Sequence, residues 1–268
     1  MSPNSESSIN VSDNDTETRD RRLFDSIAAD YARKDRVKSS SIVRKYQLFR
    51  ALKPIIESRK NLGTILEIAC GIGAPANYLE GYYDRYIGID YSEQMIKAAK
   101  IFNERNEKAS FIAANIKSVT RIDSKADLIL AIGALHHMTD HATVFDTLKN
   151  LAKPEADFVA MEPNRGNALI QLFRKTRAKF DTSYSAAQMY FLSSELKELA
   201  VSNGLVDITV VPQGYFSPPM AQIIIPPQLL TVPLSSLLVA IDSLIDKGES
   251  SFFAKLSWNL IIRAKFPK

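Results

Sequence analysis

The chain has 268 residues, of which 46% are hydrophobic and 24% charged, and its net charge is +4, so one large or two small globular domains are expected. Lysine and arginine are scattered among acids, with no long basic run interleaved with aromatic residues, so a nucleic-acid partner is not expected. A single cysteine, Cys70, excludes a disulfide framework. The polar N-terminus does not have the form of a signal peptide, and no proline-free apolar run is long enough to span a bilayer. We therefore expect a cytoplasmic protein without a transmembrane segment.

The N-terminal part is predicted to contain a polar tail followed by two helices. Residues 1–20 are mostly Ser, Asn, Asp and Glu, which bury too little apolar surface to offset their ordering entropy, so disorder is expected. From Arg22, apolar residues recur at helical spacing as far as Tyr31. A second helix is predicted from Ser39 through Leu52, with Pro54 ending or kinking it. Residues 21–60 would thus be a helical segment at the start of a single domain, 21–268.

The next stretch has the form of a nucleotide-binding corner. A largely apolar run, Thr64–Ile68, predicts a buried parallel strand. It leads into Gly71 and Gly73, where the missing Cβ lets the backbone approach a ligand. Pro75 suits the first turn of a helix, since a missing N–H costs little there.

The remaining core alternates predicted strands and helices, which indicates an α/β fold with a mostly parallel sheet. Ser92 is expected to cap the helix after the second strand, a further helix spans 141–152 and stops before Pro154, and another is capped by Ser193. The strands after the first are predicted at 85–89, 110–114, 127–132, 157–161, 205–211 and 258–264.

The segment 212–255, between the last two strands, has an unusual composition. Paired prolines break it, and a helix after Pro233 would present one apolar face, formed by Leu234, Leu237, Leu238, Ile241, Leu244 and Ile245. One interpretation is that this face packs on the protein's own core. The other is that the segment is an acceptor-side lid or touches a membrane, as an apolar acceptor would require.

Ligands of open α/β sheets bind beyond the carboxyl ends of the strands, so the residues that stand there are the candidate site. Strand by strand they are Glu67 with the glycines, Asp90, Asn115, the run Gly133–His137, and Glu162. Asp90 is a natural acceptor for ribose hydroxyls, and Asn115 can accept from an adenine amino group.

Two interpretations of the corner are open. Gly71-x-Gly73-x-x-Ala76, with Asp90 about 20 residues on, fits the dinucleotide fingerprint of nicotinamide-dependent oxidoreductases. The same stretch resembles the first motif of class I S-adenosylmethionine-dependent methyltransferases, with Glu67 as its acid and Ala69 in place of its first glycine. Glu67 favours the second interpretation, because a carboxylate repels a diphosphate and attracts a sulfonium ligand that carries an amino group.

Further motifs extend the resemblance over about residues 22–165. The run 126–137 resembles the fourth motif of that family and 153–164 its next element, while 24–31 resembles the N-terminal helix of the ubiquinone/menaquinone-biosynthesis type, which caps the cofactor. The resemblance implies a Rossmann-like, seven-stranded, mostly parallel sheet with helices on both faces, an antiparallel last strand, an N-terminal helical cap and a long insertion between strands six and seven. It implies S-adenosyl-L-methionine as cofactor and no metal, with binding residues Tyr31, Glu67, Ala69, Gly71, Gly73, Asp90, Tyr91, Met95, Asn115, Ile116, Ala131 and His136.

The implied reaction is transfer of the methyl group to a small-molecule acceptor, for which we predict a hydroxyl oxygen of an apolar or aromatic metabolite. A histidine suits the general base that a hydroxyl needs. His136 is favoured over its neighbour His137, with His141 as a third candidate, and Glu162 could orient a partner or face the acceptor. A structural role is the alternative for each histidine. An oxidoreductase and a non-catalytic methyltransferase-like partner subunit are the alternative functions.

Overall fold

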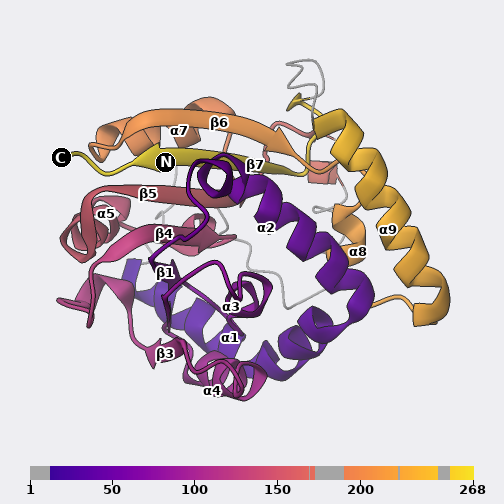
Figure 1. The fold of residues 1–268 in the computed structure, drawn as a ribbon, viewed down its shortest axis with the longest axis horizontal. Helices are drawn as coiled ribbons and strands as arrows, with labels where there is room; N and C mark the ends of the chain where they lie inside the picture. The colour runs from indigo at the N-terminus through magenta and orange to yellow at the C-terminus, as the bar shows by residue number, and fades with distance from the viewer. Residues whose placement is uncertain (1–12, 169, 173–189, 223, 247–253) are drawn as a thin grey trace, which may run out of the picture.

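The computed structural model of the protein describes residues 13–168, 170–172, 190–222, 224–246 and 254–268. Its centre is a seven-stranded sheet in the order β3-β2-β1-β4-β5-β7-β6 (Figure 1). β7 runs antiparallel to both of its neighbours, and the other pairs are parallel, which confirms the predicted fold class. The strands are β1 (Thr64–Ile68), β2 (Arg85–Asp90), β3 (Ala109–Ala113), β4 (Ala126–Ile132), β5 (Ala152–Pro163), β6 (Val206–Gln213) and β7 (Asn259–Lys265).

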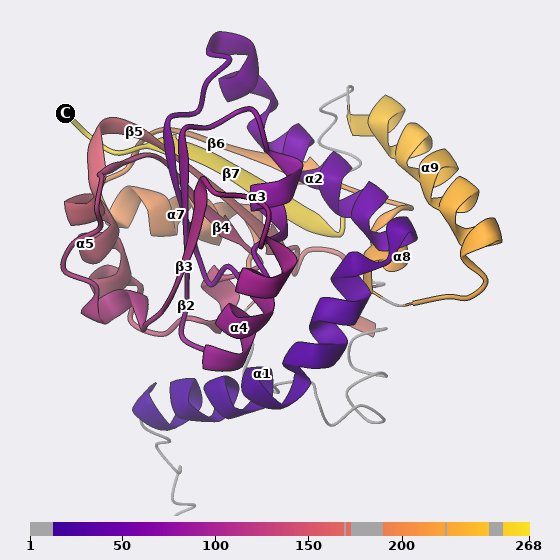
Figure 2. The ribbon, with the colours of Figure 1, turned by 60° about the horizontal axis from the view of Figure 1, so that its bottom comes forward.

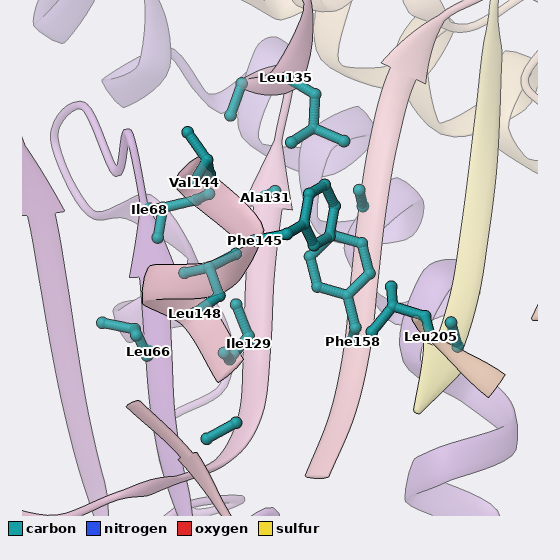
Figure 3. Close-up of a cluster of buried hydrophobic side chains, with 14 of the residues drawn as sticks. Leu66, Ile68, Ile129, Ala131, Leu135, Val144, Phe145, Leu148, Phe158 and Leu205 are labelled. Atoms are coloured by element: carbon teal, nitrogen blue, oxygen red, sulfur yellow. The ribbon is translucent and has the colours of Figure 1, made fainter. Parts of the chain in front are cut away.

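Two apolar layers hold the helices on the two faces of this sheet. Phe145 and Leu148 pack on one face against Ile129 and Phe158, at the centre of the cluster that Figure 3 shows. The other face is covered by α2, α3 and α4, with buried side chains such as Leu52 from α2. The helices are α1 (Asp13–Arg36), α2 (Lys38–Ser58), α3 (Ala74–Tyr78), α4 (Glu93–Phe102), α5 (His141–Leu151), α7 (Ser193–Ser202), α8 (Pro218–Gln222) and α9 (Gln228–Ile245), with short 3-10 turns η1 (Ile116–Ser118) and η2 (Leu135–His137).

The N-terminal segment is helical earlier than expected. α1 begins at Asp13, so the prediction of disorder is wrong for residues 13–20, while 1–12 lie outside the described residues. The Asp25 carboxylate fixes this helix to the start of α4, because it accepts hydrogen bonds from the Ser92 hydroxyl (2.6 Å) and the Gln94 amide (3.4 Å). Such tertiary contacts can stabilise a helix whose own sequence is too polar to bury a wide apolar face.

α2 continues past Pro54 to Ser58, so of the two predicted effects of this proline, an end or a kink, the end does not occur. Proline has no N–H for the carbonyl of residue 50, one turn earlier. Arg263 of β7 supplies the missing donors, because its guanidinium donates to the carbonyl oxygens of Arg50 (2.9 Å) and Ala51 (2.7 Å). The guanidinium of Arg263 therefore compensates for the hydrogen bond that Pro54 cannot make, and the helix continues beyond it.

Two other predicted boundaries also shift. β5 begins at Ala152, so that Lys153 and Pro154 belong to the strand, and the Lys153 ammonium lies 2.8 Å from the Asp127 carboxylate. α7 begins at Ser193, and the residue at its N-cap is Leu192, whose amide donates to the Glu195 carboxylate (2.8 Å). The predicted Ser193 cap is therefore wrong, since an acid one turn into the helix satisfies the backbone donor instead.

α9 starts before Pro233 and lies alongside α2 (Figures 1 and 2). The interpretation that its apolar face packs on the protein's own core is wrong, because Leu237 and Leu244 are 58% and 68% exposed. Among the described residues, α9 is the one helix whose length and composition would allow it to cross a membrane. Only 17% of it is buried in the fold. This differs from the expectation that no such segment exists, since the helix tolerates its internal proline.

Candidate active site

A cavity of about 560 Å³ opens beyond the carboxyl ends of β1, β2 and β4, where the fold class predicts a ligand. α1, α2 and α8 contribute to its walls. The sequence-predicted residues that line it are Tyr31, Glu67, Ala69, Gly71, Asp90, Tyr91, Met95, Asn115, Ile116, His136 and His137.

The glycine corner forms the floor of the cavity. Gly71 has a left-handed φ of +53°, and a Cβ built there would meet nothing closer than the Tyr31 ring at 4.0 Å, so the space above it is open. Gly73 also has a left-handed φ, but a Cβ there would lie 2.3 Å from the Phe111 ring. Gly73 is not among the residues that line the cavity, unlike the prediction, and both its left-handed φ and the close packing under the corner require a glycine there.

Ala69 stands in a left-handed conformation with φ 49°, at the position where the resembling family has a glycine. A non-glycine residue there costs backbone free energy, so the substitution strains the turn. The neighbouring Cys70 is buried, and burial raises the pKa of its thiol well above the usual range. A protonated thiol is a poor nucleophile, which fits the interpretation of Cys70 as a packing residue.

Asp90 is tied to the corner from the end of β2. Its two carboxylate oxygens accept hydrogen bonds from the amides of Gly71 and Ser92, each at 2.9 Å. Burial raises the pKa of Asp90, and these two backbone hydrogen bonds act in the opposite direction. Each oxygen keeps a second lone pair, so the carboxylate can still accept from two hydroxyl groups in the cavity.

Glu67 lies at the end of β1 with 2% of its surface exposed, and the Tyr86 hydroxyl donates to its carboxylate. Burial raises the pKa of Glu67 to about 8, since the hydrogen bond from Tyr86 compensates only in part. A cationic group in the cavity would favour the ionised form, so binding of a cationic ligand would lower the pKa of Glu67.

His136 and Glu162 form a buried pair between the ends of β4 and β5. The Glu162 carboxylate is 2.7 Å from His136 Nδ1, and it also accepts from the amides of Ala134 (3.0 Å) and Leu135 (2.8 Å). Glu162 is fully buried and does not line the cavity, so the prediction that it could face the acceptor is wrong. It orients its partner instead: a neutral His136 whose Nδ1–H donates to a carboxylate carries its lone pair on Nε2.

The other two histidines have structural contacts. His137 Nδ1 is 3.3 Å from the Asp20 carboxylate, and its ring packs edge-on against Phe24, so it connects η2 to α1. His141 Nε2 lies 3.0 Å from the Leu135 carbonyl oxygen at the start of α5. His136 and His137 both line the cavity beside a carboxylate, but the contact of His136 with the fully buried Glu162 is the shorter one, 2.7 Å against 3.3 Å.

Ala131 is the other predicted cofactor residue that does not line the cavity. Its side chain points into the cluster of buried residues with Ile129 and Phe145 (Figure 3). Successive strand residues face opposite sides, and its neighbour Ile132 is the one in the cavity wall. Asn115 does line the cavity, and its side-chain oxygen also accepts from the Lys117 amide (3.0 Å).

Sequence reasoning missed several polar and aromatic residues of the wall. Arg44 of α2 forms a buried ion pair with Asp35 of α1 (2.9 Å), and both line the cavity. Arg44 Nε and the Tyr78 hydroxyl are buried without a hydrogen-bond partner in this structure, which marks this end as suited to a polar ligand group. Tyr190 and Trp258 line another part of the wall. Each comes from a different segment, so no local spacing could have indicated them.

Comparison with known proteins identifies the central part of the chain. Residues 66–160 match the family model described as "Methyltransferase domain". A methyltransferase of Mycobacterium tuberculosis is 39% identical over 72 residues, which are 26% of this chain and 40% of that protein. A chloroplastic methyltransferase of Arabidopsis thaliana is 23% identical over 184 residues, 65% of this chain and 50% of that protein. The chain thus spans half or less of the length of these two relatives.

Solved structures confirm the fold. The magnesium protoporphyrin IX methyltransferase of Synechocystis PCC 6803, crystallised with bound SAH, superimposes with a TM-score of 0.60 at 11% identity, over 94% of this chain and 100% of that one. At this identity the similarity establishes the architecture, seven strands with the antiparallel strand β7 between β5 and β6. Among the described residues, no group of three or more His, Cys, Asp or Glu is placed to bind a metal ion.

Proposed function

We propose that the chain is a class I S-adenosylmethionine-dependent methyltransferase and that it transfers the methyl group to a hydroxyl oxygen of a small apolar or aromatic molecule. The observation that carries the proposal is the His136–Glu162 pair, which places an oriented imidazole in the wall of the cofactor cavity. A hydroxyl acceptor needs such a base, whereas a neutral amine is already nucleophilic.

The residues of the cavity fit the cofactor. Asp90 has acceptor capacity for the two ribose hydroxyls, and Gly71 leaves the open floor that a nucleoside needs. Glu67 suits the cationic amino group of the methionine part, and Arg44, whose Nε has no partner, suits its carboxylate. These roles would place the amino-acid end of the cofactor between α1, α2 and the corner.

The bound cofactor supplies an electrophilic methyl group on a sulfonium sulfur. His136 would accept the acceptor's hydroxyl proton at Nε2 when the methyl group passes from sulfur to oxygen and the neutral thioether leaves, and Glu162 would stabilise the resulting imidazolium through Nδ1. α1 covers the cavity through its contacts with α4 and His137, and so excludes water from the reaction.

The acceptor side of the cavity supports an apolar or aromatic molecule. We assign the acceptor to the part of the cavity wall beside His136 that β5 and the segments after β5 and before β7 form; Met161, Pro163, Ile170 and Trp258 line it, with Asn259 as a polar group. Apolar walls with one or two polar groups favour a ligand that is mostly hydrocarbon and is oriented by a single hydrogen bond.

The two alternative functions have less support. An oxidoreductase would place a dinucleotide diphosphate at the corner beside Glu67, where the diphosphate gains no favourable charge interaction: it repels the ionised carboxylate and holds the group protonated, whereas a cationic ligand attracts the carboxylate. A non-catalytic subunit would have no need of the buried carboxylate that orients His136, since burying a charged group costs free energy even when it has hydrogen-bond partners.

A titration and a turnover assay test the proposal together. In a calorimeter the protein should bind S-adenosylmethionine and not NAD, and radiolabelled methyl should move to a phenol but not to the matched aniline. His136→Gln should lower turnover on the phenol by about two to four decades with cofactor affinity unchanged. His141→Gln is the matched control and should retain turnover, because an amide can still donate to the Leu135 carbonyl. Transfer to the aniline alone, or equal turnover of both variants, would contradict the hydroxyl assignment.

A further inference from the structure

The amphipathic character of α9 is inverted. Its buried residues are polar, Thr231, Ser235 and Asp242, while Leu229 is 84% exposed. Surface helices of globular proteins normally have the opposite arrangement. We call the exposed residues the α9 apolar surface; they are Ile224, Ile225, Leu229, Leu230, Leu234, Leu237, Ile241 and Leu244.

The polar inner face fixes the helix in this orientation. The Asp242 carboxylate accepts from the amides of Phe216 and Ser217, both at 2.9 Å, and from the Ser217 hydroxyl at 2.6 Å. At the C-terminal end, the Asp246 carbonyl accepts from the Arg50 guanidinium of α2 (2.7 Å). Rotating α9 to bury its leucines would break these bonds and leave the buried amide and hydroxyl of Ser217 without an acceptor. The outward leucines are therefore a fixed feature of the surface, and a contiguous apolar patch marks an interaction site.

A basic cluster borders this surface. Within residues 33–38, at the junction of α1 and α2, four residues are basic and one is acidic, and Arg33, Arg36 and Lys38 are exposed. The Ser39 amide donates to the Gln228 side chain (3.2 Å), which brings the junction against the N-terminal end of α9. Figure 2 shows this junction at the lower end of α2. An apolar helix face bordered by cations is complementary to anionic lipid headgroups above an acyl layer.

The same features disfavour a second copy of the chain as the occupant. The exposed residues 230, 234, 237, 241 and 244 have the spacing of a coiled-coil seam. A seam is normally flanked by charged residues that pair across the interface, and α9 contains no Lys or Arg. Leu229 and the two isoleucines before the helix widen the patch beyond a seam.

We infer that the α9 apolar surface docks on a lipid bilayer that carries anionic headgroups, with α9 lying in the plane of the interface. The helix lies along the surface rather than across the bilayer, because Asp242 and its partners hold it on the protein. α8 connects the surface with the cavity, since Ala221 and Gln222 line the cavity and Ile224 and Ile225 are exposed just beyond. Docking would place the cavity beside the acyl layer, so that an apolar acceptor could enter from the membrane. This entry of the acceptor rests on the proposed function, but the docking itself does not.

Vesicle co-sedimentation of the full chain tests the inference. The protein should sediment with phosphatidylcholine vesicles that contain about 30% phosphatidylglycerol, and binding should weaken as salt is added. The triple variant Leu229→Ser/Leu237→Ser/Leu244→Ser should lose binding by about a hundredfold or more, because three exposed leucines no longer enter the acyl layer. Its melting temperature should not fall, since these side chains are exposed in the fold.

Two controls separate the parts of the inference. Ile101→Ser/Val201→Ser removes equally exposed apolar residues elsewhere, 62% and 57% exposed, and should bind vesicles like the wild type. Arg36→Gln/Lys38→Gln should weaken binding to the anionic vesicles about tenfold and leave binding to pure phosphatidylcholine unchanged. The inference is overturned if the wild type does not sediment with anionic vesicles, or if the leucine variant binds them as well as the wild type. It is also overturned if light scattering shows a dimer that the leucine variant dissociates while vesicles bind neither form.

Discussion

Glu67 should release a proton when S-adenosylmethionine binds, and Glu67→Gln should abolish this release. Burial raises the pKa of Glu67 to about 8, so at pH 7 roughly nine in ten molecules of the ligand-free protein carry it neutral. The cationic amino group proposed to lie near it favours the carboxylate form. Glutamine is nearly isosteric with the neutral acid and can still accept from the Tyr86 hydroxyl.

The size of the effect follows from the shift. If the bound pKa falls to its usual range, binding at pH 7 releases about 0.9 proton, and affinity rises about tenfold from pH 6 to pH 7. The free energy of unfolding has the opposite dependence on pH. Between pH 4.5, the pKa of Glu67 in the unfolded chain, and about pH 8, its pKa in the native protein, the native state holds a proton that the unfolded state has lost. The contribution of Glu67 to the free energy of unfolding therefore falls as the pH rises through this window, and Glu67→Gln should remove that fall.

Calorimetric titration at pH 7 in phosphate and in Tris measures the protons released, because the observed heat includes the ionisation of the buffer. The difference between wild type and Glu67→Gln is the informative quantity, since titration of the ligand's own amino group contributes equally to both. Glu57→Gln, at an exposed carboxyl on α2, is the matched control and should behave like the wild type. Equal proton release by wild type and Glu67→Gln would refute the reasoning.

Three further substitutions test the remaining roles. Gly71→Val should abolish cofactor binding in calorimetry, because its side chain would enter the open floor below Tyr31; Gly71→Ala, at the same left-handed φ, should lose less, and equal losses would mean that backbone strain alone is responsible. Asp90→Ala should weaken the cofactor about tenfold or more, through the loss of a charge-assisted hydrogen bond; unchanged affinity would move the ribose elsewhere. Glu162→Gln should lower turnover and shift its pH profile with little change in cofactor affinity, as expected of a positioning residue; an unshifted profile would indicate a purely structural role for Glu162 toward His136.

The amino-acid sequence by itself determines the order of elements and the glycine corner. Parallel strands buried on both faces, such as β1 and β4, appear as largely apolar runs; β1 has Glu67 near its end and leads into Gly71, and β4 is followed directly by Gly133. Glycines are recognisable at positions with a left-handed φ or close packing, because few other residues can adopt that conformation or fit that space. These signals are local, so the sequence is sufficient to indicate Glu67, Gly71 and Asp90 as residues of the site.

Pairings between distant segments were decided only by the tertiary structure. Glu162 and His136 are 26 residues apart and meet because β5 pairs with β4; sequence could identify each as a strand-end residue, but not which one faces the cavity. Pro54 indicated a helix end or a kink, and the helix continues because the guanidinium of Arg263 donates to the carbonyl of Arg50. Propensity describes a residue and its neighbours, whereas the missing donor came from another strand.

The orientation of α9 shows the same limit in its clearest form. Periodicity established that one face of this helix is apolar, but it does not state whether that face points inward or outward. The partners of Asp242, on the backbone and hydroxyl 25 and 26 residues earlier, fix the polar face inward and leave the leucines outside. If the helix turned its leucines toward the protein, the buried amide and hydroxyl of Ser217 would lose the carboxylate that accepts from them, and this cost opposes the inward orientation of the apolar face.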